Sequence, residues 1–233
     1  MTTAHALLTG MIPAAYLLGS VPFGLLIART RGIDPRKAGS GNIGATNVGR
    51  LLGLKFFAIV FVLDLLKGFV PTLTAVIIRR VLTSGVAPTK TDYLLQLLVG
   101  FAAIFGHMCS IFLGFKGGKG VATSSGVVLG VFPYFTIAAA IGGAIFGLVF
   151  MTTRYVSLAS MAGAIGFGVG YIALALLAHW PLLTDQLPLL IFAILIPLAI
   201  IYKHRGNIAR LRAGTENPLT RTHNPATDSP TQP

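Results

Sequence analysis

Long apolar runs with almost no charge alternate along this chain with short polar segments. We interpret the runs at residues 6–28, 51–78, 93–115, 155–178 and 187–202 as membrane spans, because a crossing helix needs roughly 20 mostly apolar residues. Only 10% of the chain is charged, whereas soluble domains carry about 25% charged residues. The pattern predicts an all-α integral membrane protein.

The run at residues 121–153 contains no charge but does contain Pro133 near its middle. It is too long for one span, and two full spans would need about 40 residues. Because proline ends or kinks a helix, we expect a short helix to about Val131 and a second helix from about Tyr134. With these two, the predicted fold is a seven-helix bundle that includes short helices.

The positive charge of the chain supports that count. The net charge is +12, carried by 18 Lys and Arg. Seven crossings put fourteen of the 18 on one side, whereas Arg79, Arg80 and Lys90 lie on the other. Because cytoplasmic loops collect Lys and Arg, we expect the N-terminus outside and the C-terminus in the cytoplasm. We expect residues 1–217 to form the membrane domain and the Pro- and Thr-rich residues 218–233 to be a disordered tail.

Such a positive face suits anionic lipids or anionic substrates. We expect no nucleic acid partner, because the sequence offers no soluble basic domain to bind one. A metal site is also not expected, because the five His and the single cysteine, Cys109, are scattered. Metal-dependent hydrolysis is therefore disfavoured.

A glycine- and lysine-rich loop follows the third apolar run. Exposed backbone N–H groups, two lysines and the start of a helix near Val121 would together form an anion site that suits phosphate. The alternative is a flexible basic loop. A Walker A loop is excluded because Leu113 and Gly120 occupy positions that require glycine and a hydroxyl residue. The loop consists of Lys116, Gly117, Gly118, Lys119 and Gly120.

The polar segment at residues 32–50 contains a G-x-G-x-x-G pattern at Gly39 to Gly44, with Asp64 twenty residues after Gly44. A dinucleotide site needs a strand before this pattern, whereas this segment lies between two predicted spans. We therefore expect it to fold back and line a polar site, or alternatively to be a solvated loop. Its small polar residues are Ser40, Asn42, Thr46 and Asn47.

Polar residues elsewhere complete the candidate set. His204 and Asn207 are three residues apart near a helix end and so share one face. Arg210 and Arg212 are expected to be solvated charge. Glu216 is a lone acid among arginines, which predicts a structural ion pair. Asp64 and Lys67 lie three apart inside an apolar run, which predicts a buried structural pair rather than a functional site.

Several of these segments resemble the bacterial acyl-phosphate:glycerol-3-phosphate acyltransferases of phospholipid synthesis. The resemblance lies in GSGNIGATNVGR (39–50), GHMCSIFLGFKGGKGVAT (106–123) and HRGNIARLRAGTEN (204–217), with GSVPFG (19–24), DLLKG (64–68) and RYVSLAS (154–160) in support. It implies a seven-helix enzyme of the bacterial inner (plasma) membrane with its active site on the cytoplasmic face. That enzyme moves an acyl group from acyl phosphate to the 1-hydroxyl of glycerol 3-phosphate. Lysophosphatidic acid and phosphate are the products of this first acylation step.

The resemblance also implies roles for single residues. Ser40 and Arg50 match functional residues of the first motif, and the glycine loop, with Thr123 just beyond it, matches the phosphate-binding motif. His204 and Asn207 match a functional pair, and Glu216 matches an acid that is important mainly for structural integrity. Gly206 departs from the family, since many members carry an acid there. The resemblance implies membrane lipids and the two substrates as partners, with no cofactor and no obligate protein partner.

The residues and the resemblance together favour direct attack of the substrate hydroxyl on acyl phosphate. Lys119, Arg50 and loop amides would bind phosphate, while His204 and Asn207 position the substrate. A substrate phosphate or His204 would be the base. An acyl-enzyme on Ser40 is the alternative, although no neighbouring base is apparent, and Cys109 is disfavoured by its apolar surroundings.

Two other functions remain open from the sequence. A secondary transporter for a phosphorylated small molecule would place its site near the bilayer midplane, between inverted repeats. An acyltransferase that uses acyl-CoA or acyl carrier protein would differ only in its donor.

Overall fold

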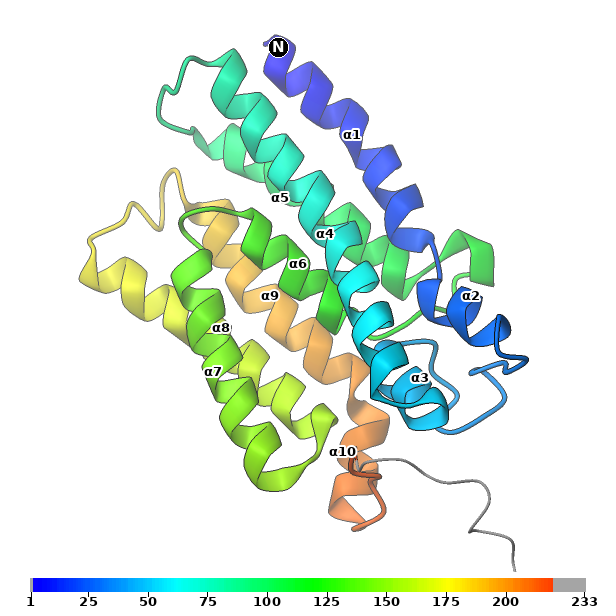
Figure 1. Cartoon of the computed structure of the whole chain (residues 1–233). Helices are drawn as coiled ribbons and strands as arrows, with labels where there is room; N and C mark the ends of the chain where they lie inside the picture. The colour runs from blue at the N-terminus through cyan, green and yellow to red at the C-terminus, as the bar shows by residue number, and fades with distance from the viewer. Residues whose placement is uncertain (1, 220–233) are drawn as a thin grey trace, which may run out of the picture.

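The computed structural model describes residues 2–219, and within them the chain is helical with no strand. This confirms the predicted all-α membrane fold. Figure 1 shows the helices packed into one bundle. Along the chain they are α1 (Thr3–Ser20), α2 (Phe23–Arg29), α3 (Ala45–Leu52), α4 (Leu54–Leu82), α5 (Lys90–Met108), the 3₁₀ turn η1 (Ile111–Leu113), α6 (Val121–Gly130), α7 (Thr136–Thr153), α8 (Val156–Leu177), α9 (Leu187–Lys203) and α10 (Arg205–Arg212).

The division of the run at residues 121–153 follows the prediction. Helix α6 ends at Gly130 and α7 begins at Thr136, on either side of Pro133. With ten residues, α6 is about 15 Å long, which is roughly half of a bilayer core.

The number of crossings depends on how the short helices are counted. Five helical segments of the described chain are long and apolar enough to span a membrane, or six if the bent pair α9–α10 counts as one span. Seven crossings require α6 to count as well, so this number stays a prediction, as does the orientation of the termini.

Two elements differ from the expected pattern. The first apolar run is broken at Val21 and Pro22 into α1 and α2, because proline has no N–H to continue the helical ladder. The segment at residues 32–50 contains α3, whose Val48 is fully buried beside Val60 of α4. The helix was not predicted, but the segment does fold back on the bundle, as expected, and is not a solvated loop.

Small residues bring α4 and α6 into close contact. A Cβ atom on Gly126 of α6 would lie 2.0 Å from the Leu65 carbonyl oxygen, and one on Gly68 of α4 would lie 2.2 Å from the Thr123 carbonyl oxygen. Only glycine permits this backbone approach, which is a common device for packing helices in membranes. It fixes where α6 begins, and therefore where the glycine loop ends.

The three polar segments singled out in the sequence meet at one end of the bundle. In Figure 1, α3, α10 and the loop that leads into α6 lie toward the lower end, while the N-terminus lies at the opposite end. Helix α10 bends away from α9 by 57°, which turns His204 and Asn207 toward the other two segments. All three segments contribute to a single cavity.

Candidate active site

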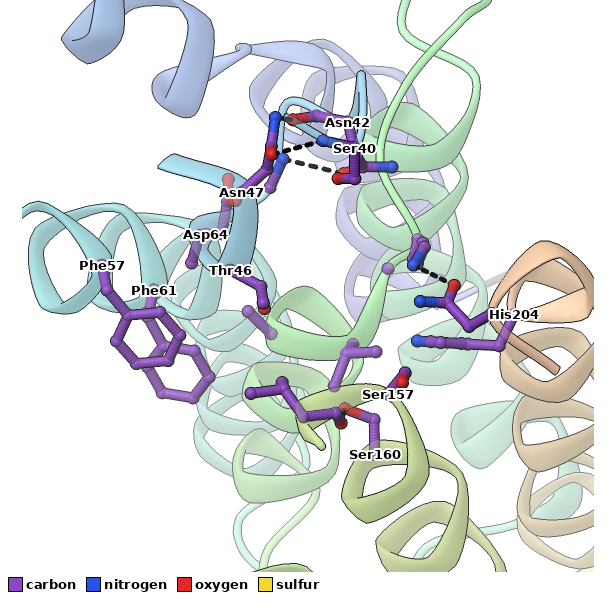
Figure 2. A pocket seen from close by; sticks show the side chains of 18 of the residues that line it. Ser40, Asn42, Thr46, Asn47, Phe57, Phe61, Asp64, Ser157, Ser160 and His204 are labelled. Atoms are coloured by element: carbon purple, nitrogen blue, oxygen red, sulfur yellow. Dashed lines mark hydrogen bonds between the residues drawn. The ribbon is translucent and has the colours of Figure 1, made fainter. Parts of the chain in front are cut away.

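A cavity of about 100 Å³ lies where the three segments meet. Figure 2 shows Ser40, Asn42 and Asn47 on one side of it, with His204, Ser157 and Ser160 across from them. Of the predicted site residues, the lining includes Ser40, Asn42, Thr46, Asn47, Arg50, Asp64, Lys119, Gly120, His204, Asn207 and Glu216. Residues far apart in the chain thus form one polar site.

Asn47 organises the first segment. It is 1% exposed, and its amide nitrogen donates to the carbonyl oxygens of Pro35, Ala38 and Asn42 at 2.9, 3.1 and 2.8 Å. Its Oδ1 accepts from the Ser40 N–H at 2.8 Å (Figure 2). Asn47, which we expected to help line a polar site, is therefore engaged within its own loop, where it shapes the wall of the cavity.

Arg50, on α3, lies at the edge of the cavity. One Nη donates to the Asn217 carbonyl oxygen at 2.6 Å, while the buried Nε has no hydrogen-bond partner within residues 2–219. Burial lowers the pKa of the guanidinium, but an arginine still remains charged in a protein. Arg50 therefore offers a cation and a free donor to an anion in the cavity.

The glycine loop contributes less of its own backbone than expected. The N–H groups of Gly117 and Gly118 donate to the carbonyl oxygens of Met108 and His107 at 3.3 and 3.0 Å, so these amides are not available to phosphate. Lys116 is exposed and lies outside the cavity lining, as do Gly117, Gly118 and the fully buried Thr123.

The end of the loop does reach the cavity. Lys119 and Gly120 line it together with Val121 and Ala122, the first residues of α6. The first N–H groups of a helix have no partner within the helix and attract anions. Of the groups predicted to form the anion site, Lys119 and the helix N-terminus therefore reach the cavity.

A hydrogen-bonded network ties Lys119 to the third segment. The Lys119 ammonium donates to Asn207 Oδ1, and Asn207 Nδ2 donates to Glu216 Oε1 at 2.6 Å. Ser157 Oγ donates to the same oxygen at 2.7 Å, and Arg210 Nε donates to Glu216 Oε2 at 2.7 Å. The ion pair expected for Glu216 is confirmed. Its partner is Arg210, which we expected to be solvated charge and whose side chain is 41% exposed.

Burial and the surrounding charges set the protonation states in this network. Burial raises the pKa of the Glu216 carboxyl, but hydrogen bonds from Asn207, Ser157 and Arg210 outweigh it and hold the pKa below its ordinary value. Burial, together with the positive charges of Arg210 and Arg50, lowers the pKa of Lys119 to about 8, against the opposing effect of Glu216.

His204 is neutral at physiological pH. Burial, followed by the nearby charge of Lys119, lowers its pKa to about 4. Its Nδ1 lies 2.8 Å from the Ile200 carbonyl oxygen, which can only accept. Nδ1 therefore carries the proton, and Nε2 is an acceptor on the ring that Figure 2 shows reaching toward the cavity.

Some lining residues were not predicted. Ser157 and Ser160, three apart at the start of α8, present hydroxyl groups to the cavity, and Phe57, Phe61 and Phe146 form its apolar wall. The serine spacing at the start of an apolar helix was a usable signal. The phenylalanines carried none, because any membrane helix has many.

An apolar cavity of about 290 Å³ adjoins the polar one. The two share Phe61, Val121, Phe146 and Ser160. The larger one runs between α4, α6, α7, α8 and α9, where its lining includes Leu129, Gly143 and Phe167. A polar site that opens into an apolar space suits an amphiphilic ligand with an anionic head and a hydrocarbon chain.

Comparison with known proteins agrees with this geometry. The family model described as glycerol-3-phosphate acyltransferase matches residues 9–214. The glycerol-3-phosphate acyltransferase of Geobacter sulfurreducens is 45% identical over 204 residues, covering 87% of this chain and 93% of the relative. That of Aquifex aeolicus is 43% identical over 211 residues, covering 87% and 94%.

Solved structures give the same result. The crystal structure of PlsY (YgiH), an integral membrane glycerol 3-phosphate acyltransferase, in its glycerol 3-phosphate form aligns with a TM-score of 0.75 and 41% identity. The alignment covers 91% of this chain and 94% of that chain. The lysophosphatidic acid form of PlsY aligns with a TM-score of 0.73. The chain therefore belongs to the glycerol-3-phosphate acyltransferase family.

Proposed function

We propose that this chain transfers a fatty acyl group from an acyl phosphate to the 1-hydroxyl of glycerol 3-phosphate, giving lysophosphatidic acid and phosphate. The observation that carries the proposal is one cavity in which Lys119, Arg50 and the start of α6 face the neutral ring of His204, beside an apolar space. The PlsY structures with glycerol 3-phosphate and lysophosphatidic acid support the same acceptor and product.

The reaction needs no group from the protein to carry the acyl chain. The hydroxyl oxygen attacks the carbonyl carbon, the bond from that carbon to the phosphate oxygen breaks, and the hydroxyl proton passes to a phosphate oxygen. Phosphate is a good leaving group, so the protein's task is to align the reactants and stabilise the developing oxyanion. The free N–H groups at the start of α6 are suitable donors.

The site residues divide this work. Lys119 and Arg50 bind phosphate groups by charge, and Asn207 holds the Lys119 ammonium in place. His204 accepts a hydrogen bond from a glycerol hydroxyl at Nε2, since its Nδ1 proton is held by Ile200. Because its pKa is about 4, His204 serves to orient the hydroxyl rather than to remove its proton completely.

The apolar cavity of about 290 Å³ is the proposed site of the acyl chain. Ser160 lies at its junction with the polar cavity, where the scissile carbonyl would sit. The polar cavity lies at one end of the bundle, which supports an enzyme of the cytoplasmic membrane face over a transporter with a site near the midplane.

Direct attack is favoured over an acyl-enzyme at Ser40. Ser40 is exposed, and its hydroxyl makes no hydrogen bond to a histidine, lysine or carboxylate of the described chain. A serine nucleophile needs such a base for activation. Ser40 is therefore proposed as a group that positions the substrate.

The test is to measure product formation and covalent labelling in the same purified enzyme. We expect lysophosphatidic acid from palmitoyl phosphate and glycerol 3-phosphate. A drop of about 10²-fold or more in kcat/KM is expected for Lys119→Ala and Arg50→Ala. Intact-mass spectra of enzyme quenched with palmitoyl phosphate alone should show no added acyl group. A palmitoyl adduct that Ser40→Ala abolishes would contradict direct attack.

A further inference from the structure

Three ionisable side chains are buried together between α4 and α5, and two of them, Asp64 and His107, form part of the wall of the polar cavity. Asp64, Lys67 and His107 are 3%, 2% and 5% exposed. Lys67 Nζ lies 2.7 Å from Asp64 Oδ1, and His107 Nδ1 lies 3.6 Å from the same oxygen. Ionisable groups are costly at membrane depth and usually mark function, so their place at the wall of the active site needs an explanation.

His107 holds the glycine loop from two sides. Its carbonyl oxygen accepts a hydrogen bond from the Gly118 N–H at 3.0 Å. Its ring lies flush against the same residue, since a Cβ atom on Gly118 would be 2.2 Å from His107 Nε2. The residue after Gly118 is Lys119, whose ammonium reaches the cavity. The loop backbone at Gly118 therefore packs directly on the His107 imidazole.

The ring is in turn oriented by its buried neighbours. His107 Nδ1 has no hydrogen-bond partner within residues 2–219 and lies within ion-pair distance of the Asp64 carboxylate. Asp64 is paired with Lys67, and Lys67 Nζ also donates to the Val21 carbonyl oxygen at 2.9 Å, at the break between α1 and α2. This connects the position of the loop to three helices.

We propose that His107, oriented by Asp64, is a positioning residue that sets the glycine loop, and through it Lys119, against the substrate phosphate. The Asp64–Lys67 pair then does more than balance charge inside the bundle. The inference rests on the proposed function, because it assigns Lys119 a phosphate to bind. It adds a group that acts through the glycine loop and determines where the phosphate-binding cation lies.

A positioning role differs measurably from a purely structural one. If His107 only stabilises the fold, His107→Ala lowers the amount of active enzyme, which reduces apparent kcat and leaves KM unchanged. If it positions Lys119, KM for the phosphate-bearing substrates rises on the order of tenfold or more, because small misplacements at a reacting site have large effects.

Two adjacent glycines offer a matched pair for a double-mutant cycle. The Cβ atom in Gly118→Ala meets the His107 ring, whereas that in Gly117→Ala would lie 2.0 Å from the His107 carbonyl oxygen, which is backbone. Removing the ring should therefore relieve the Gly118→Ala defect but not the Gly117→Ala defect. In the His107→Ala background we expect Gly118→Ala to lower kcat/KM by less than a further twofold. Gly117→Ala should lower kcat/KM by the same factor as it does in the wild-type background.

Amide hydrogen exchange gives a readout that does not depend on activity. We expect faster exchange of peptides spanning residues 114–121 in His107→Ala and in Asp64→Asn than in wild type. If His107→Ala does not fold, His107→Asn replaces it in the cycle, because asparagine removes the imidazole ring but keeps a polar amide near the Nδ1 position.

The outcomes separate the two proposals. The positioning role would be overturned if each glycine substitution lowered kcat/KM by the same factor with and without the His107 ring, and if amide exchange at residues 114–121 were unchanged in His107→Ala. A wild-type enzyme that makes no lysophosphatidic acid from acyl phosphate would instead overturn the proposed function, and the exchange data would still report on His107.

Discussion

At the scale of single residues, burial gives two basic side chains opposite tasks. Lys119 and His204 both face the cavity, and burial lowers the pKa of each. Lys119, with a pKa of about 8, stays mainly cationic at neutral pH, whereas His204, with a pKa of about 4, is neutral. The same environment therefore supplies a cation for phosphate and an uncharged acceptor for a hydroxyl.

This difference predicts an alkaline limit to activity. As pH rises through about 8, the free enzyme loses the Lys119 charge, so phosphate binding should weaken. We expect kcat/KM for glycerol 3-phosphate to fall about tenfold per pH unit above that point, with kcat changing less because bound phosphate keeps the lysine protonated. Steady-state rates between pH 6 and 10 would test this.

Lys119→Arg is the matched control, because an arginine keeps its charge throughout this range. The alkaline fall should disappear in that variant. A wild-type profile that stays flat to pH 10, or the same fall in Lys119→Arg, would rule out Lys119 as the titrating group.

At the scale of elements, the short helix α6 is central to the site. Its N-terminus lines the polar cavity, and Val128 and Leu129 line the apolar one. Its position depends on glycine contacts with α4, where the backbones approach too closely for any side chain. This short helix therefore lines both the polar cavity and the apolar cavity that is the proposed site of the acyl chain.

Gly126→Ala should disturb this arrangement. The new methyl group would lie 2.0 Å from the Leu65 carbonyl oxygen, and such overpacking typically costs about 1–3 kcal/mol. We expect a lower thermal unfolding temperature in detergent. Gly147→Ala on α7 is the control, since nothing lies within 4 Å of its Cβ position. Equal unfolding temperatures for the two variants would contradict the close packing of α4 and α6.

The apolar cavity predicts a change in chain-length preference. Gly143 of α7 lines it, with open space at the Cβ position, so Gly143→Leu should fill part of it. We expect kcat/KM for palmitoyl phosphate to fall at least tenfold relative to a ten-carbon donor. Gly147→Leu, which lies outside the lining, should leave the ratio unchanged. An unchanged ratio in Gly143→Leu would place the acyl chain elsewhere.

At the scale of the whole molecule, the polar site lies at one end of the bundle, to which seven crossings would assign fourteen of the 18 Lys and Arg. That asymmetry predicts that the segment at residues 32–50 faces the cytoplasm, and that the connection between α4 and α5 faces outside. Single cysteines in a Cys109→Ala background would test it. A membrane-impermeant maleimide on intact cells should label Val86→Cys but not Lys37→Cys. The reverse pattern would invert the topology.

The sequence predicted much of this architecture because its strongest signals are local. The spans follow from hydropathy, and Pro133 alone was enough to separate α6 from α7. Helix α3 was not predicted, because glycines and small polar residues obscure its apolar face. The bundle, and not the local sequence, stabilises that helix through the buried Val48.

The candidate site was predictable as a set of segments but not as a set of contacts. Ser40, Lys119, His204 and Asn207 do share one cavity. The sequence could not indicate that Asn47 is engaged by its own loop or that Arg210 pairs with Glu216. Both depend on distances that exist only after folding.

The most direct test of the account is a donor comparison with the purified protein. Glycerol 3-phosphate would be incubated separately with palmitoyl phosphate and with palmitoyl-CoA, and lysophosphatidic acid and released phosphate would be measured. We expect product from palmitoyl phosphate alone, with one phosphate released for each lysophosphatidic acid formed. Product from palmitoyl-CoA alone, or no product from either donor while glycerol 3-phosphate still binds, would contradict the proposed reaction.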